Sequence, residues 1–169
     1  MSALILLIVP ALALPLQVPE ERPFRDPEGR YQLVLRDRWE PVTYQDGAGN
    51  TVTDIVYGSS EEGLLRIRQF AVEPGVSPRA FAEREEETSL RFRPGYLRGA
   101  IESFGGVYPE SVVFNFEFTR RGQKKMARYY YFKTDERTIY VLQFEGRPDV
   151  IRSTRNRLDL IARSFRARS

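Results

Sequence analysis

The sequence predicts a single α+β domain in which an antiparallel sheet is packed against helices. Runs of alternating apolar and polar residues, separated by short turn signals, occur along most of the chain. Three of them, at 111–120, 124–134 and 138–146, follow one another closely enough to form an antiparallel meander. Two stretches, 77–92 and 148–165, instead show helical periodicity. A length of 169 residues is typical of one domain.

The first 19 residues are typical of a secretory signal peptide. No charged side chain precedes Glu20, and the mostly apolar run over 3–16 is shorter than the roughly 20 residues of a membrane-spanning helix. Ala11-Leu12-Ala13 supplies the small-x-small pattern that a signal peptidase recognises. We therefore expect an exported protein of the periplasm, cell envelope or medium, with a polar lead-in over 20–29 and the folded domain over 30–169. An uncleaved membrane anchor and a buried first strand are the alternatives.

Alternation and turn signals predict the first strands of the domain. Residues 31–35 alternate after the turn signal at 26–29, and Trp39 follows them. We expect this tryptophan in the core, because its large area dominates burial, while an exposed ligand platform is the alternative. Strands over 42–45 and 51–57 flank a glycine-containing loop and should form a hairpin.

The first helix follows a strand over 64–72, in which Leu65 and Ile67 face away from Arg66 and Arg68. Ser77 is a favourable N-cap, followed by a proline that suits the first helical turn. The residues expected together on one face of this helix are Phe81, Thr88 and Phe92. The acidic residues Glu83, Glu85, Glu86 and Glu87 are expected on a solvated face, with a carboxylate metal or catalytic site as the alternative.

The later strands and the last helix show the clearest periodicity. An irregular strand is expected near 99–104, and the strand over 111–120 places one face on the residues Val112, Phe114, Phe116 and Phe118. In the strand over 138–146, Tyr140, Leu142 and Phe144 face one way, whereas Val141, Gln143 and Glu145 face the other. The last helix carries an apolar stripe that consists of Ile151, Thr154, Leu158, Ile161 and Phe165. We expect this stripe to lie across the sheet, with Phe165 as its last core residue.

The composition excludes several kinds of chemistry. The chain has no cysteine and no histidine, so disulfides, thiol nucleophiles and Ser-His-Asp or Cys-His triads cannot be formed within it. Arginine supplies 23 of the 26 basic residues, and the formal net charge is +3. We expect no catalytic residue, no cofactor and no metal site.

The order of the elements resembles that of the PsbP-like fold, which includes PsbP, the Mog-type Ran-binding proteins and many uncharacterised bacterial exported proteins. The stretches that carry this resemblance, within 29–166, are "GRYQLVLRDRW", "VSPRAFAEREE", "ARYYYFKTDERTIYVLQFEGRPDVI" and "LDLIARSFR". The resemblance implies an α/β/α sandwich and a role in binding rather than catalysis. PsbP is an extrinsic subunit of photosystem II, and Mog-type proteins bind a small GTPase. The histidines of plant PsbP that contact metals have no counterpart here.

The function expected from these observations is that of a non-enzymatic, exported binding or accessory module of the cell envelope. Its partner would be a protein or an anionic envelope surface, and the membrane would be touched only through an uncleaved N-terminal segment. The residues expected to contact such a partner are Arg120, Arg121, Lys124, Lys125, Arg152 and Arg155.

Three other functions remain open from the sequence. Nucleic acid could bind to the basic and aromatic stretch 120–133, in which the aromatic residues Tyr129, Tyr130, Tyr131 and Phe132 would stack on bases. A hydrolase could use carboxylates alone, and the candidates are Asp54, Glu102, Glu117 and Glu145. A small apolar ligand could lie between sheet and helix, although a filled core is the simpler expectation.

Overall fold

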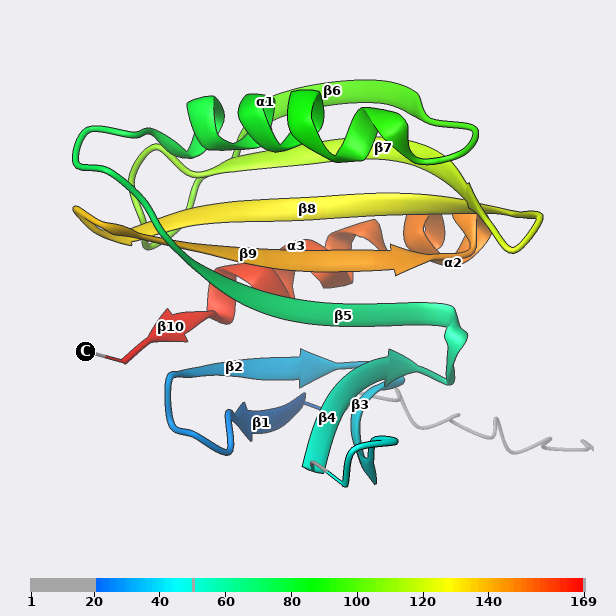
Figure 1. Ribbon diagram of the computed structural model, residues 1–169. Coiled ribbons are helices and arrows are strands. Elements are labelled where there is room, and N and C mark those ends of the chain that lie inside the picture. The colour runs from blue at the N-terminus through cyan, green and yellow to red at the C-terminus, as the bar shows by residue number, and fades with distance from the viewer. Residues whose placement is uncertain (1–20, 50, 169) are drawn as a thin grey trace, which may run out of the picture.

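The computed structural model describes residues 21–49 and 51–168 of the chain (Figure 1). The predicted signal peptide over 1–19 lies outside these residues. The fold is a single α+β domain with antiparallel sheets and helices on both faces of the larger sheet, as the resemblance to the PsbP-like fold implies.

The larger sheet has seven strands in the order β3-β4-β5-β9-β8-β7-β6, and every neighbouring pair is antiparallel. Its strands are β3 (Trp39–Gln45), β4 (Thr51–Tyr57), β5 (Ser59–Ala71), β6 (Leu97–Ser103), β7 (Val112–Arg120), β8 (Gln123–Asp135) and β9 (Thr138–Gly146). The meander expected from the sequence is β7-β8-β9. Strand β5 pairs along most of its length with β9. Strand β4 pairs only with the first half of β5, as far as Leu65, which lies opposite Ile55.

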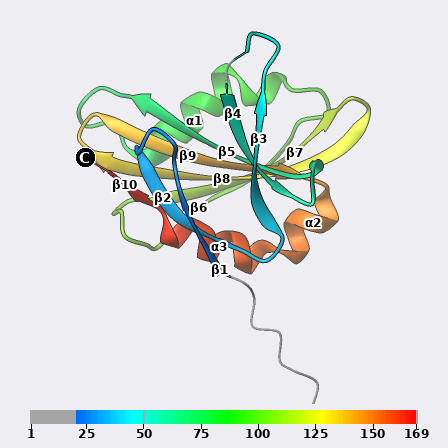
Figure 2. The same ribbon diagram turned by 90° about the horizontal axis from the view of Figure 1, so that it is seen from below.

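A smaller sheet contains β1 (Glu21–Arg25), β2 (Tyr31–Arg36) and β10 (Arg166–Ala167), with β2 in the centre. Strand β1 lies in the segment that the sequence predicts to be a polar lead-in, and its pairing runs from Glu21 opposite Arg36 to Arg25 opposite Gln32. In the view of Figure 2 this sheet lies in front of the larger one, beside the β3–β4 hairpin.

The helices lie on opposite faces of the larger sheet (Figure 1). The helix α1 (Pro78–Thr88) and the short 3₁₀ helix η1 (Leu90–Phe92) cover one face, and α2 (Pro148–Ser153) and α3 (Arg155–Ser164) lie on the other. Because both faces are covered, the alternating strands bury side chains in two separate cores. Trp39 is fully buried in the core on the α3 side, as expected for the only tryptophan.

The last helical segment confirms the predicted apolar stripe. All five of its residues are buried, and Phe165 is only 1% exposed. The segment is nevertheless two helices, because α2 ends at Ser153 and α3 starts at Arg155. The Thr154 hydroxyl donates a hydrogen bond of 2.7 Å to the carbonyl oxygen of Val150, a local bond that is known to bend helices.

The predicted apolar face of the first helix is wrong in part. Phe81 is buried, but Thr88 is exposed and Phe92 is 73% exposed. The α-helix ends at Thr88, and the tighter turn of η1 changes the phase of the pattern, so that Leu90 enters the core instead.

The N-cap of α1 provides a direct test of the helix start. The Ser77 side-chain oxygen accepts a hydrogen bond of 3.1 Å from the backbone N–H of Ala80. We expect Ser77→Ala to lower the free energy of unfolding by about 1 kcal/mol, because one N–H at the helix start then loses its partner. Ser77→Asp should retain the stability of the wild-type chain. Denaturant unfolding measures both, and equal losses for the two variants would contradict the assigned cap.

No helix within residues 21–49 and 51–168 has the length and apolar character needed to cross a bilayer.

Candidate functional site

The predicted partner contacts do not form one site. Arg121 is exposed at the β7–β8 turn and pairs with Glu61 at 3.7 Å, and the neighbouring Lys124 is also exposed. Lys125 is only 1% exposed, because its ammonium group donates to a carboxylate oxygen of Glu61 at 2.9 Å and to the Glu61 carbonyl oxygen at 2.7 Å. Strand alternation turns its side chain inwards, so it offers no surface contact.

Arg152 and Arg155 lie on the other face of the larger sheet. Arg152 is 2.5 Å from the carboxylate of Glu117, and Arg155 is 3.6 Å from that of Glu102. Both arginines are more than half exposed, so these ion pairs contribute little to stability, but they offset the positive charge of this surface.

Arg152 and Arg155 line a pocket on their own face of the sheet, and Arg120 leads to a second pocket on the α1 side. A pocket of about 330 Å³ lies between the strands β5 and β9, the end of α1 with η1, and the end of β7. Its charged lining consists of Arg66, Arg68, Arg93, Arg120, Glu85 and Glu145. We call this pocket the arginine pocket.

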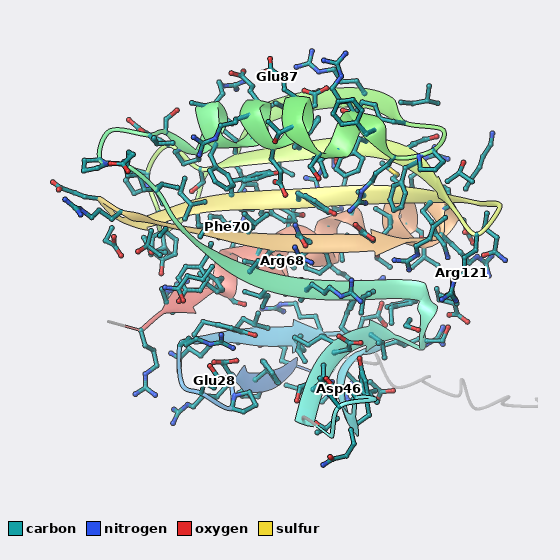
Figure 3. All side chains as sticks on the ribbon, in the orientation of Figure 1. Glu28, Asp46, Arg68, Phe70, Glu87 and Arg121 are labelled. Carbon is teal, nitrogen blue, oxygen red and sulfur yellow. The ribbon has the colours of Figure 1, made fainter. Side chains whose placement is uncertain are left out.

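Arg121 does not line the arginine pocket. Figure 3 shows Arg68, which does line it, over the middle of the sheet, whereas Arg121 lies at the end of the sheet.

Glu145 organises one wall of the arginine pocket. Its carboxylate accepts hydrogen bonds from Arg93 at 2.7 Å, from Arg120 at 3.3 Å, and from the hydroxyl of Tyr129. The guanidinium of Arg93 also lies over the ring of Phe118, 4.5 Å from its centroid. Burial opposes ionisation of Glu145, but the Tyr129 hydrogen bond and the charge of Arg93 outweigh it and lower the pKa of this carboxyl. Glu145 therefore stays ionised and holds both arginines in place.

The floor of the arginine pocket is the α1-facing side of β5 and β9. Arg66 lies opposite Gln143 in the sheet, and Arg68 lies opposite Val141. Both arginines are exposed, and neither forms an ion pair or a side-chain hydrogen bond within residues 21–49 and 51–168. Their guanidinium donors are thus available to a ligand.

Glu85 from α1 faces the same pocket. The hydroxyl of Tyr131 donates a hydrogen bond of 2.7 Å to its carboxylate. Burial raises the pKa of Glu85, although the hydrogen bond from Tyr131 and the charges of Arg68 and Arg93 act in the opposite direction. The acidic residues of the first helix are therefore not all on a solvated face. Glu87 does point away from the sheet (Figure 3), whereas Glu85 and Glu86 are half-buried.

The raised pKa of Glu85 gives a test that depends on pH. The folded state binds this proton more tightly than the unfolded chain, so the resulting stabilisation is present at low pH and is lost as pH rises through the folded-state pKa. We expect Glu85→Gln to raise the melting temperature at pH 7 more than at pH 4. Glu87→Gln, on the outer face of the same helix, is the matched control. A shift for Glu85→Gln that is equal at both pH values would contradict this reading.

The carboxylates considered for a hydrolase are not assembled. Asp54 accepts a hydrogen bond from Tyr44 in the β3–β4 hairpin, and Glu145 belongs to the arginine pocket. Glu102 and Glu117 are paired with Arg155 and Arg152 on the opposite face of the sheet. In addition, no group of three or more acidic, histidine or cysteine side chains within the described ranges could hold a metal ion.

The aromatic residues of β8 do not form a stacking surface for bases. Tyr129, Tyr130, Tyr131 and Phe132 are all at most 2% exposed, because helices cover both faces of the strand. Alternation alone could not show this, since it gives the two faces of a strand but not the elements that cover them.

The residues that the sequence analysis missed are Arg66, Arg68 and Arg93. The alternation of 64–72 did place both β5 arginines on one face, opposite Leu65 and Ile67. The alternation does not show what lies beside this face, and only the docking of α1 and η1 makes it the floor of a pocket.

Comparisons of sequence find no relative, since no family model and no curated protein matches the chain. Comparisons of structure do find similar folds. LpqN of Mycobacterium tuberculosis, a protein involved in cell envelope biogenesis, matches with a TM-score of 0.57 at 12% identity, over 87% of this chain and 90% of LpqN. PA94 of Pseudomonas aeruginosa, a protein of unknown function, matches with a TM-score of 0.56 at 12% identity, over 88% of this chain and 98% of PA94.

The cyanobacterial PsbP of Synechocystis sp. PCC 6803 has the same arrangement. It matches with a TM-score of 0.53 at 10% identity, over 92% of this chain and 97% of that protein. Identities this low show the fold alone. The expectation drawn from the order of strands and helices is confirmed, and the chain has the PsbP-like fold.

Proposed function

We propose that this chain is an exported, non-enzymatic binding module of the cell envelope that holds an anionic group of its partner in the arginine pocket. The observation that carries the proposal is the pair Arg66 and Arg68, two exposed cations on the floor of a pocket that have no partner among the residues the structure describes. Arginine is well suited to such a site, because its planar fork binds carboxylates and phosphates through two parallel hydrogen bonds.

Two further observations support a binding role over catalysis. The carboxylate of Glu145 is occupied by Arg93, Arg120 and Tyr129, and its lowered pKa makes it a poor proton acceptor near neutral pH. The chain also lacks histidine and cysteine, the side chains that most often act as base or nucleophile.

The envelope location is supported by the N-terminal sequence and by one structural neighbour. The apolar run over 3–16 and the pattern at 11–13 are typical of a signal peptide. LpqN, which shares the fold, is involved in cell envelope biogenesis. We expect the protein in the envelope or outside the cell, with the N-terminal signal peptide cleaved at a site within residues 14–20.

Site-specific photo-crosslinking in the native cell tests the proposal. A photoreactive residue at Thr119, which lines the arginine pocket and is half-buried, should capture a partner in the envelope fraction. The same residue at Glu87, on the outer face of α1, is the control and should capture much less.

The double variant Arg66→Gln/Arg68→Gln should abolish the adduct at Thr119 while the protein stays folded. An adduct that forms equally with this variant, or a protein that remains in the cytoplasm, would overturn the proposal. Mass spectrometry of the protein isolated from the envelope determines its mature N-terminus in the same experiment.

A further inference from the structure

We propose that the arginine pocket is a binding site for a phosphate monoester group, which Arg66 and Arg68 bind directly. This inference rests on the proposed function and names the chemical class of its ligand. It follows from the spacing of the two free arginines, from the fixed arginines on the opposite wall, and from the charge of the pocket.

The spacing of Arg66 and Arg68 suits a ligand group with several oxygens. The two residues are next-nearest neighbours on one face of β5, so their Cα atoms are about 7 Å apart. Strand β4 pairs with β5 only as far as Leu65, so the edge of β5 beside the two arginines is not paired in the described residues. Their long side chains extend from the floor of the pocket and can meet on one tetrahedral group.

The opposite wall supplies donors that are already oriented. Arg93 is held by Glu145, by Tyr129 at 3.3 Å and by the ring of Phe118, and Arg120 is held by Glu145. A guanidinium has five N–H donors, and among the described residues Arg120 uses only one of them. A ligand would meet these donors without the entropy cost of ordering two more side chains.

The charge of the pocket matches a dianion. Its lining has four arginines and two glutamates, so with all six ionised the net charge is 4 − 2 = +2. A phosphate monoester has a charge of about −1.5 to −2 at pH 7 and three acceptor oxygens. A single carboxylate would leave half of this positive charge uncompensated.

The size of the pocket indicates that the phosphate is part of a larger molecule. A volume of about 330 Å³ exceeds that of the bare ion, and the apolar residues Leu64, Leu90 and Phe118 also line the space. The group attached to the phosphate should therefore be a short, partly apolar one. Both a soluble phosphomonoester and a lipid with a terminal phosphate headgroup have this chemistry.

Isothermal titration calorimetry with glycerol 3-phosphate tests the inference on the mature protein. We expect binding that weakens at least about tenfold in Arg66→Gln/Arg68→Gln, because each substitution removes a charge-assisted hydrogen bond. The matched control is Arg152→Gln/Arg155→Gln, which removes two exposed arginines from the other face and should leave the affinity unchanged. Circular dichroism melts verify that both double variants are folded.

Malonate, a dicarboxylate with the same charge, distinguishes a site for phosphate monoesters from a pocket that binds anions in general. If malonate binds as tightly as glycerol 3-phosphate and both are lost in Arg66→Gln/Arg68→Gln, the phosphate class is overturned, while the anion pocket of the proposed function stands. If neither anion binds, or if binding is unaffected by the double variant, both are overturned.

Vesicles distinguish the two sources of the phosphate. Co-sedimentation with phosphatidylcholine vesicles that contain phosphatidic acid, but not with phosphatidylcholine alone, would support a lipid headgroup, provided that Arg66→Gln/Arg68→Gln abolishes it. Binding of glycerol 3-phosphate without sedimentation would support a soluble phosphomonoester. Sedimentation that the double variant leaves intact would contradict a role for the pocket.

Discussion

Replacing Phe165 with alanine is expected to lower the free energy of unfolding by about 3–5 kcal/mol, which is the usual cost of removing a buried phenylalanine side chain. Phe165 is 1% exposed and follows directly after α3. Its ring is stacked on Phe132 with centroids 5.6 Å apart, and it contacts Tyr140 at 5.2 Å and Tyr31 at 5.7 Å. These rings belong to both sheets, so the cavity left by the missing phenylalanine ring would weaken the packing between the two sheets.

The matched control for this substitution is Leu160→Ala. Leu160 lies on α3, close to Phe165 in the sequence, but it is 45% exposed, so its truncation should cost much less than that of Phe165. Urea unfolding at neutral pH gives both values. A loss below about 1 kcal/mol for Phe165→Ala would mean that α3 and its following residues are not docked as described.

Asp159→Ala is expected to cost about 3 kcal/mol, the lower end of the range for breaking a buried ion pair. Asp159 on α3 accepts hydrogen bonds from Arg128 at 2.7 Å and from the hydroxyl of Tyr130 at 2.6 Å. The side chain of Arg128 is only 4% exposed, so its charge would stay buried, with the oxygens of Asn115 and Tyr130 as its remaining neighbours. The lower end of this range of costs applies because Asp159 is itself 26% exposed, so water can partly replace the lost carboxylate.

A double-mutant cycle separates the buried charge from the loss of packing. Arg128→Met fills similar space without a charge, so the combination Arg128→Met/Asp159→Ala should be more stable than Asp159→Ala alone. If the double variant is less stable than Asp159→Ala by the full effect of Arg128→Met, the two residues are independent and the assigned ion pair does not contribute.

The sequence predicts the second half of the fold best, for a physical reason. The β7-β8-β9 meander is built from neighbouring strands, and both its alternation and its turns are local. The stripe from Ile151 to Phe165 is likewise read from residues a few positions apart. The interruption at Thr154 is harder to predict, because threonine is tolerated in helices and only its hydrogen bond to Val150 marks the bend.

The elements that the sequence analysis missed depend on distant partners. Strand β1 contains Pro23 and has a polar composition, so it is a strand only because β2 pairs with it. Strand β10 has two residues, too few for any pattern. The arginine pocket is also a long-range feature, since α1 and η1 must cover the face of β5 that carries Arg66 and Arg68 before that face becomes a site.

The pairing of β10 with β2 has a consequence for how the chain is made. The backbone N–H of Val34 donates a hydrogen bond of 2.8 Å to Ser164, 130 positions further along, and Ala167 lies opposite Tyr31. A nascent polypeptide therefore cannot complete its smaller sheet until Arg166 and Ala167 have left the ribosome, and contacts of such separation form slowly.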